Sequence, residues 1–144
     1  MSISLKEIAV ATDEFFKLHW LIPGETPPEW SSEPYTGTGF IPFGKLPGCY
    51  ALLRVGEVVY IGSGVSRGNA RYQGWGLASR LRQYTRRNAA AGDDIWSFRY
   101  GHTGVHTIGF PTNRAYLVLA LEMFLISRFS DRLDNKKRTL YEDE

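Results

Sequence analysis

The fold is decided by one stretch near the middle of the chain, Gly48-Cys49-Tyr50-Ala51-Leu52-Leu53-Arg54-Val55-Gly56-Glu57-Val58-Val59-Tyr60-Ile61-Gly62. Two runs of β-prone residues flank one internal glycine, and a further glycine closes each outer end. This pattern predicts a β-hairpin. Each arm of the hairpin carries one tyrosine, Tyr50 and Tyr60.

The register of the hairpin decides whether these two phenols share a face. A two-residue loop would place Tyr50 opposite Ile61, with the phenols on opposite faces. A three-residue loop, residues 54–56, would place Tyr50 directly opposite Tyr60. Such loops favour glycine at their last position, where φ is positive, and Gly56 stands there. We therefore predict the three-residue loop and two phenols on one face. The register matters because a shift of one residue would move one phenol to the opposite face.

Length and composition predict one compact domain. The chain has 144 residues, of which 43% are hydrophobic, enough for a substantial core. It contains no run of about 18 apolar residues and no signal-peptide pattern. Its single cysteine, Cys49, fits a reducing compartment and a small buried side chain. We expect a cytoplasmic protein that does not associate with membranes.

Basic charge is concentrated directly after the hairpin. Residues 58–92 include six arginines and no carboxylate. A phosphate backbone is the commonest partner for such a patch, although a solvated basic surface would have the same composition. The six residues are Arg67, Arg71, Arg80, Arg82, Arg86 and Arg87.

The rest of the chain predicts an α+β fold. A capping box starting at Ser4 opens a helix over residues 5–20, and a proline-rich extended arm follows to residue 47. Residues 77–91 predict a second helix, and the alternation over residues 95–100 predicts a third strand. We expect a small, mainly antiparallel three-stranded sheet flanked by helices, with residues 1–47 packed on a core formed by residues 48–144.

The last predicted helix runs from about Pro111 to Phe129 and is apolar nearly all round, so we expect it to be central and buried. Glu122 interrupts it. A buried carboxylate must be neutralised by a proton, a cation or a metal, because its desolvation costs several kcal/mol. An ion pair with an arginine would serve equally well. His102 and His106 lie in the glycine-rich segment before this helix, which we expect to be a loop unable to fix metal-ligand geometry.

Several of these residues together resemble the signature of the GIY-YIG nucleases. The triplets 48–50 and 60–62 resemble the paired motif, and residues 77–84 are similar to the family's helix with its catalytic arginine. Residues 121–126 resemble the helix with the metal-binding glutamate, and Asn135 falls near the family's asparagine. The resemblance covers about residues 48–136. The long segment between Gly62 and Arg80 looks like that of the type II restriction endonucleases in this family.

The resemblance implies metal-dependent hydrolysis of DNA, leaving 5′-phosphate and 3′-hydroxyl ends. Glu122 would hold one Mg²⁺ or Mn²⁺ together with waters, and Arg80 would contact the phosphate oxygens. Either Tyr50 or Tyr60 would accept the proton of the attacking water, and we favour Tyr50. The implied catalytic residues are Tyr50, Tyr60, Arg80, Tyr84, Glu122 and Asn135.

The chain departs from the family pattern in the first triplet, where Cys49 is an apolar replacement, and after the second triplet. Ser63 stands where many members carry a lysine, and Lys45, Arg67 and Arg71 are the candidates to replace that contact. The expected partner is double-stranded DNA, and a homodimer on DNA would explain cleavage of both strands. The expected DNA contacts are Lys45, Ser63, Arg67, Arg71, Arg82, Arg86, Arg87, Lys136 and Lys137. A non-catalytic nucleic-acid-binding relative and an interaction domain remain the alternatives.

Overall fold

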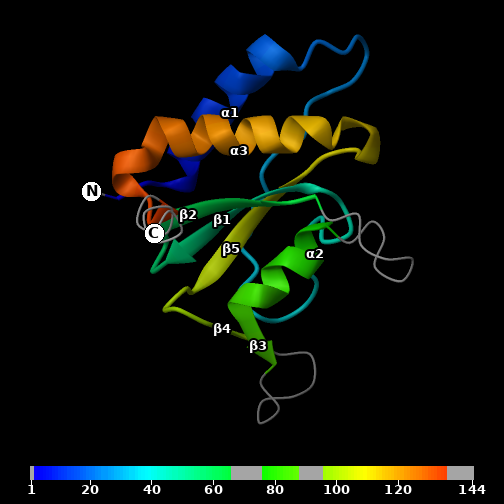
Figure 1. Ribbon diagram of the computed structural model, residues 1–144. Helices are drawn as coiled ribbons and strands as arrows, with labels where there is room; N and C mark the ends of the chain where they lie inside the picture. The colour runs from blue at the N-terminus through cyan, green and yellow to red at the C-terminus, as the bar shows by residue number, and fades with distance from the viewer. Residues whose placement is uncertain (1, 66–75, 88–95, 136–144) are drawn as a thin grey trace, which may run out of the picture.

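A three-stranded antiparallel sheet lies at the centre of the molecule, with helices on both of its faces (Figure 1). The computed structural model describes residues 2–65, 76–87 and 96–135. The strand order is β2-β1-β5, with β1 at Gly48–Arg54, β2 at Glu57–Gly64 and β5 at Gly104–Gly109. The predicted α+β class and three-stranded sheet are therefore confirmed.

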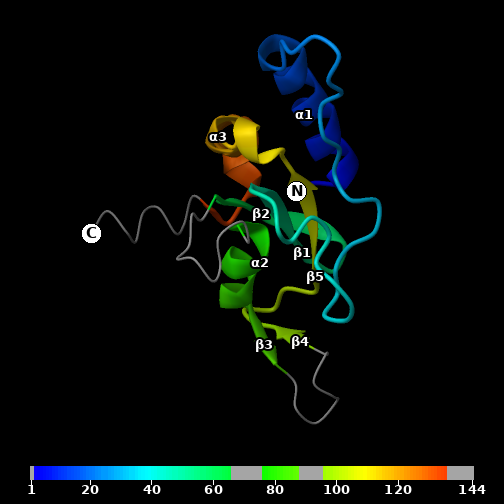
Figure 2. The same cartoon turned by 90° about the vertical axis from the view of Figure 1, so that its right-hand side faces the viewer.

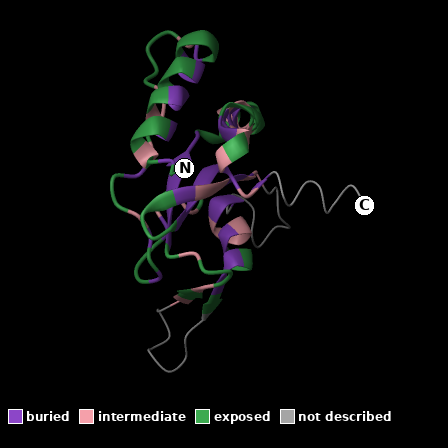
Figure 3. Cartoon of the chain, turned by 90° about the vertical axis from the view of Figure 1, so that its left-hand side faces the viewer, coloured by how far each residue is buried: buried purple, intermediate pink, exposed green. Residues whose placement is uncertain are grey.

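The two faces of the sheet support separate hydrophobic clusters. Helices α1 (Leu5–His19) and α3 (Tyr116–Phe129) cover one face, where they pack on Cys49, Ala51 and Ile61. The short helix α2 (Gly76–Leu81) covers the other face, which holds Tyr50 and Leu52. Figure 2 shows these layers, with α1 and α3 above the sheet and α2 below it. In Figure 3 the sheet between them is mostly buried. Alternate residues of β1 therefore belong to different cores.

The hairpin turns through two residues, so the predicted three-residue loop is wrong. Arg54 pairs with Glu57, and the loop residues Val55 and Gly56 have φ values of 50° and 81°. Two consecutive positive φ values are those of a type I′ turn, whose twist matches that of the flanking strands. Val55 is a β-branched residue in an unfavourable conformation, and its N–H donates to the Thr103 hydroxyl at 3.0 Å.

A β-bulge nevertheless brings the two phenols to one face. The register shifts between Leu52 and Leu53, so that Leu52 lies opposite Tyr60 and Tyr50 lies opposite Gly62. The rings of Tyr50 and Tyr60 stack with centroids 6.3 Å apart. The predicted shared face is therefore confirmed, although the extra residue of the bulge produces it rather than the turn.

The third strand of the sheet is β5, so the loop predicted for the segment around His102 and His106 is wrong for residues 104–109. All six residues of β5 are buried, so they lack the alternation that marks a strand with one solvent face. The predicted strand at 95–100 exists as β4 (Trp96–Phe98), but it pairs with β3 (Thr85–Arg87) in a separate two-stranded sheet.

Two helices differ from their predictions. Helix α2 is followed by a 3-10 turn, η1 (Arg82–Tyr84), and the chain then enters β3, so the predicted helix over residues 77–91 is too long. The helix does not continue because residues 85–87 form β3, which pairs with β4. Helix α3 is buried on one side only, because Tyr116, Leu119 and Met123 are 67%, 48% and 72% exposed. The 3-10 turn η2 (Thr112–Arg114) precedes α3.

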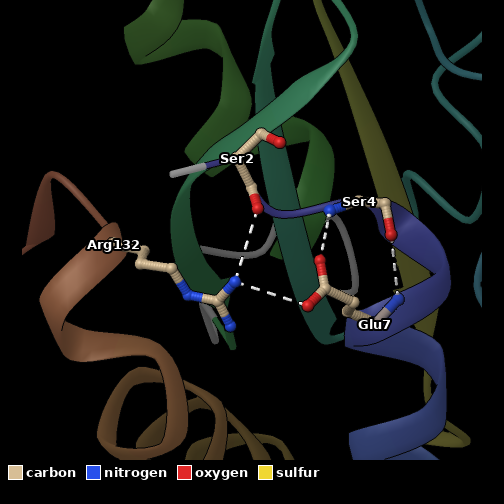
Figure 4. Close-up of polar contacts among 4 residues, drawn as sticks. All are labelled: Ser2, Ser4, Glu7 and Arg132. Carbon is tan, nitrogen blue, oxygen red and sulfur yellow. Dashed lines mark hydrogen bonds and ion pairs between the residues drawn. The ribbon is translucent and has the colours of Figure 1, made fainter.

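The predicted capping box at the start of α1 is present (Figure 4). The Glu7 N–H donates to the Ser4 hydroxyl at 3.2 Å, and the Ser4 N–H donates to the Glu7 carboxylate at 3.0 Å. Arg132, in the 3-10 turn η3 (Ser130–Arg132), donates to the same carboxylate and to the Ser2 carbonyl. The start of α1 is thereby tied to the segment that follows α3.

The extended arm covers the outer edge of β5. Ser31 N–H donates to the Thr107 carbonyl at 2.7 Å, and Tyr35 exchanges two backbone hydrogen bonds with Val105. The arm thus pairs with an edge strand that would otherwise expose its polar groups. Among the described residues, no helix is both long and apolar enough to traverse a lipid bilayer.

Gly62 is required where the Tyr50 ring crosses β2. A Cβ atom at this position would overlap the Cζ and hydroxyl oxygen of Tyr50. We expect Gly62→Ala to lower the free energy of unfolding by about 1–3 kcal/mol, the usual cost of overpacking. Urea denaturation of Gly62→Ala, Tyr50→Leu and the double variant measures this. The glycine substitution should cost less in the Tyr50→Leu background, and an equal cost in both backgrounds would contradict the packing argument.

Candidate active site

Three tyrosines meet on the face of the sheet that α2 covers. Tyr50 comes from β1, Tyr60 from β2 and Tyr84 from η1. Ring centroids are 5.6 Å apart for Tyr50 and Tyr84, and 5.9 Å apart for Tyr60 and Tyr84. The Tyr50 hydroxyl donates to the Tyr84 hydroxyl at 3.1 Å. The structure thus brings together three residues that the sequence placed in one site.

The environment of Tyr50 makes it a poor base. Its side chain is fully buried, and burial raises the pKa of the phenol well above its ordinary value. The hydrogen bond to Tyr84 and the nearby phenols raise this pKa further, while Arg80 opposes them. A phenol that gives up its proton so reluctantly cannot deprotonate water at neutral pH. Tyr60 is half-buried and lines a cavity, so it is the better placed of the two predicted bases.

Arg80 is held beside β2 by an unusually close contact between α2 and the strand. A Cβ at Gly76 would lie 2.6 Å from the Gly64 carbonyl oxygen, so only glycine allows the two backbones to approach this closely. The backbone of α2 is also tied to the preceding loop, because Ala78 N–H donates to the Gly44 carbonyl at 2.8 Å. Nε of Arg80 is buried and has no hydrogen-bond partner within the described part of the chain.

Glu122 reaches the site from α3, on the opposite side of the sheet. Its carboxylate accepts a hydrogen bond from the Ser63 hydroxyl at 3.0 Å. Burial raises the pKa of Glu122, while the Ser63 hydrogen bond and the positive charge of Arg80 oppose this rise. Arg80 and Glu122, from opposite layers, therefore lie close enough to interact electrostatically near the end of β2.

A cavity of about 330 Å³ opens at this place. Ser63 and Gly64 of β2 line one side, and Ser79 and Arg80 of α2 line the other. The cavity is thus bordered by the guanidinium and by the hydroxyl that holds the Glu122 carboxylate. An anion of phosphate size could reach Arg80 here, since a guanidinium binds such groups through paired N–H donors.

A single carboxylate is the donor that this part of the molecule offers to a Mg²⁺ or Mn²⁺ ion. Within the described residues, no three His, Cys, Asp or Glu side chains are grouped in a way that could hold a metal ion. Mg²⁺ commonly takes one or two carboxylates and completes its octahedron with waters and substrate phosphate oxygens. Glu122 could supply that single carboxylate, because Ser63, which donates to it, lines the cavity beside Arg80.

Asn135 holds the backbone of β2 through a paired contact with Ile61. Its side-chain carbonyl accepts from Ile61 N–H at 3.0 Å, and its amide donates to the Ile61 carbonyl at 2.7 Å. This paired contact satisfies both polar groups of an edge-strand residue between Tyr60 and Gly62. Asn135 thus acts on the site by holding the backbone of β2.

The remaining predicted DNA contacts are only partly described. Lys45 and Arg82 are exposed and border a second cavity beside α2, and the Arg82 guanidinium lies 4.0 Å above the Trp96 ring. Arg86 is exposed on β3, not on a helix as predicted. The Arg87 backbone ends β3, but its side chain lies outside the described residues, as do Arg67, Arg71, Lys136 and Lys137.

Two features of the site were not predicted from the sequence. Ser63 was expected to contact DNA, and its hydrogen bond to the Glu122 carboxylate was not foreseen. Gln83 lines the Arg80 cavity and was not singled out, because nothing in a lone glutamine next to Tyr84 marks it as functional.

Comparisons with protein-family models, with curated proteins and with solved structures found no match for this chain. The family assignment therefore remains a prediction based on the residues quoted above.

The raised pKa of Glu122 predicts a pH-dependent gain in stability on substitution. Burial disfavours the carboxylate, so the folded state binds this proton more tightly than the unfolded chain. Glu122 therefore weakens the fold at neutral pH, and this penalty disappears below the ordinary pKa near 4.5. We expect Glu122→Gln, which can still accept from Ser63, to raise the melting temperature at pH 7.5.

Thermal unfolding at pH 7.5 and at pH 4 measures the effect, with the exposed Glu33→Gln as a matched control. The advantage of Glu122→Gln should shrink at the lower pH, and Glu33→Gln should show no such trend. A lower melting temperature of Glu122→Gln at pH 7.5 would contradict the assigned environment.

Proposed function

We propose that this protein is a metal-dependent endonuclease of the GIY-YIG type that hydrolyses phosphodiester bonds of DNA. One observation carries the proposal: phenols, a guanidinium and a carboxylate from five separate elements lie near one another, with Arg80 close enough to act on the pKa of both Tyr50 and Glu122. The tyrosines come from β1, β2 and η1, while Arg80 comes from α2 and Glu122 from α3. These groups cover the three needs of phosphodiester hydrolysis, which are a base, an anion-binding group and a metal ligand.

In this proposal the scissile phosphate occupies the cavity beside Arg80. The guanidinium donates to the non-bridging phosphate oxygens and stabilises the charge that grows on them during attack. The buried Nε of Arg80, which has no partner among the described residues, is one donor that a phosphate oxygen would satisfy. Gly64 and Gly76 matter because they allow α2 to bring this guanidinium against β2.

Glu122 would hold one Mg²⁺ or Mn²⁺, with waters and phosphate oxygens as the other ligands. When bound, the metal supplies positive charge for the leaving 3′ oxygen and for the phosphate. Ser63 orients the carboxylate by donating to one of its oxygens. Metal binding also requires the ionised carboxylate, which the raised pKa of Glu122 disfavours in the absence of the metal.

Tyr60 is the proposed base that takes the proton of the attacking water. It is the half-buried member of the cluster, and it is in contact with the other two phenols. Tyr50 acts as a positioning residue that donates its hydroxyl hydrogen to Tyr84. The products are a 5′-phosphate and a 3′-hydroxyl. Double-stranded DNA as substrate, a restriction-type role and a homodimer on DNA belong to the same proposal.

The main alternative is a nucleic-acid-binding module without catalysis. Ser63 favours it, because this position carries no cation and its hydroxyl is hydrogen-bonded to the carboxylate that would hold the metal. The Arg80 cavity would then bind a phosphate without hydrolysing its ester.

Plasmid cleavage separates these readings. Purified wild-type protein should nick or linearise supercoiled DNA with Mg²⁺ and should be inactive with EDTA. Glu122→Gln and Arg80→Lys should each lose at least about 100-fold in rate, the scale for removing one electrostatic stabiliser. Glu33→Gln is the control and should cleave normally.

Two results would overturn the nuclease proposal. One is cleavage by Glu122→Gln at the wild-type rate, which would indicate another active site or a contaminant. The other is salt-sensitive DNA binding by a wild type that never cleaves with Mg²⁺ or Mn²⁺, which would support the binding module.

A pair of phenol substitutions tests which tyrosine is the base. We expect Tyr60→Phe to reduce the cleavage rate by about 100-fold or more, the lower range for loss of a general base. Tyr50→Phe should reduce the rate less and should lower the free energy of unfolding by about 1 kcal/mol, because it removes the hydrogen bond to Tyr84. Single-turnover rates and urea denaturation of both variants measure this. The reverse order of rates would assign the base to Tyr50.

A further inference from the structure

A further cavity of about 340 Å³, the Tyr100–His102 cavity, lies against the tyrosine cluster and is separate from those beside Arg80 and Lys45. Tyr60 and Tyr84 form part of its lining, and Tyr100 and His102 complete an aromatic wall. Ring centroids of Tyr84, Tyr100 and His102 are 6.1–6.4 Å apart. All three pairs meet edge to face, at interplanar angles of 62–80°, so these rings are not stacked on one another. An inserted planar ring could therefore stack on an aromatic face.

The cavity also contains groups that can recognise the polar edge of such a ring. Nδ1 of His102 is buried and has no hydrogen-bond partner among the described residues. Arg54 and Asp134 line the cavity as an ion pair at 3.3 Å. Burial and the charge of Arg54 lower the pKa of His102, with Asp134 opposing them. The neutral imidazole offers one donor and one acceptor, as nucleobase edges do.

The turn that carries Tyr100 is held in an uncommon conformation. Tyr100 and Gly101 both have positive φ, 61° and 77°, and the His102 N–H closes the turn on the Arg99 carbonyl at 3.2 Å. A bulky residue with positive φ is unfavourable and persists only when its surroundings hold it there. The result is a tyrosine that is 68% exposed at the edge of an aromatic cavity.

This cavity adjoins the proposed active site. Gln83 lines both the Tyr100–His102 cavity and the cavity beside Arg80. Tyr60 and Tyr84 line the Tyr100–His102 cavity and also belong to the tyrosine cluster. A phosphate beside Arg80 would therefore have an aromatic cavity close to it. A nucleotide attached to that phosphate carries a planar base that could enter it.

We propose that the Tyr100–His102 cavity binds the base of a nucleotide next to the scissile phosphate, turned out of the helical stack. The proposal rests on the proposed function, because it assigns a substrate subsite to the same active site. The cavity volume is at the lower end of the range of about 300–1,000 Å³ that is usual for small-molecule sites. Stacking of one base on aromatic side chains contributes about 1–3 kcal/mol.

A substrate preference follows from the cost of extruding a base. Removing a paired base from a duplex costs a few kcal/mol, and an unpaired base costs least. The enzyme should therefore bind DNA with one unpaired purine better than a fully paired duplex of the same sequence. A tenfold difference in Kd corresponds to about 1.4 kcal/mol, within the contribution expected from stacking one base.

Fluorescence anisotropy with two labelled duplexes tests this, one fully paired and one with a single bulged adenine, both in EDTA to prevent cleavage. Wild type should bind the bulged DNA about tenfold more tightly. Tyr100→Ala and His102→Ala should lose this preference, whereas Tyr100→Phe, which keeps the ring, should retain it. Tyr116→Ala, which removes an exposed tyrosine on α3, is the matched control and should also retain it. Thermal unfolding verifies that each variant is folded.

The outcomes distinguish the two proposals. Metal-dependent cleavage together with equal binding of both duplexes, or with an unchanged preference in a folded Tyr100→Ala variant, would overturn the base cavity and leave the nuclease intact. A preference that depends on Tyr100 and His102, without cleavage under any metal condition, would support the base cavity and overturn the nuclease. Absence of binding to either duplex in EDTA would overturn the base cavity, and absence of cleavage under any metal condition besides would overturn both.

Discussion

The contact between the Tyr50 ring and Gly62 determines the arrangement of the candidate site. The ring crosses the neighbouring strand at the one position where no side chain obstructs it. From there its hydroxyl reaches Tyr84, and its face stacks with Tyr60. Because β1 is the central strand, hydrogen-bonded to β2 and β5, the position of this phenol is set by the sheet. Tyr50 and Tyr60 are thus placed by strand pairing, and Tyr84 is placed by the 3-10 turn η1.

The charged groups reach the same place from opposite sides of the sheet. Helix α3 belongs to one hydrophobic cluster and α2 to the other, and β2 is an edge strand between them. At the end of this strand, Glu122 is near enough for the charge of Arg80 to affect its pKa. Each helix is held by its own apolar core, so the fold can tolerate a partly buried carboxylate at the point where the layers meet.

Local patterns identified much of the fold, and failed where partners distant in sequence decide the structure. The capping box, the presence of the hairpin and the end of α3 at Phe129 follow from neighbouring residues, although α3 begins at Tyr116 rather than near Pro111. Strand β5 was missed because burial on both faces removes the alternation that reveals a strand. The second helix was predicted too long because the pairing of β3 with β4, which follows the helix, joins residues nine to thirteen positions apart. The complete burial of Tyr50 likewise depends on segments distant in sequence.

The sequence by itself determined which chemical groups are available and in what order. The two tyrosines of the hairpin, Arg80, Tyr84, Glu122 and Asn135 are all legible as candidates, because their types and spacings are local properties. Only the tertiary structure decided what each group touches. Ser63 donates a hydrogen bond to Glu122, and the Asn135 amide donates one to the Ile61 carbonyl. The rings of Tyr100 and His102 contact the ring of Tyr84. Burial and hydrogen bonding depend on packing between remote segments, and they raise the pKa of the Tyr50 phenol above its ordinary value.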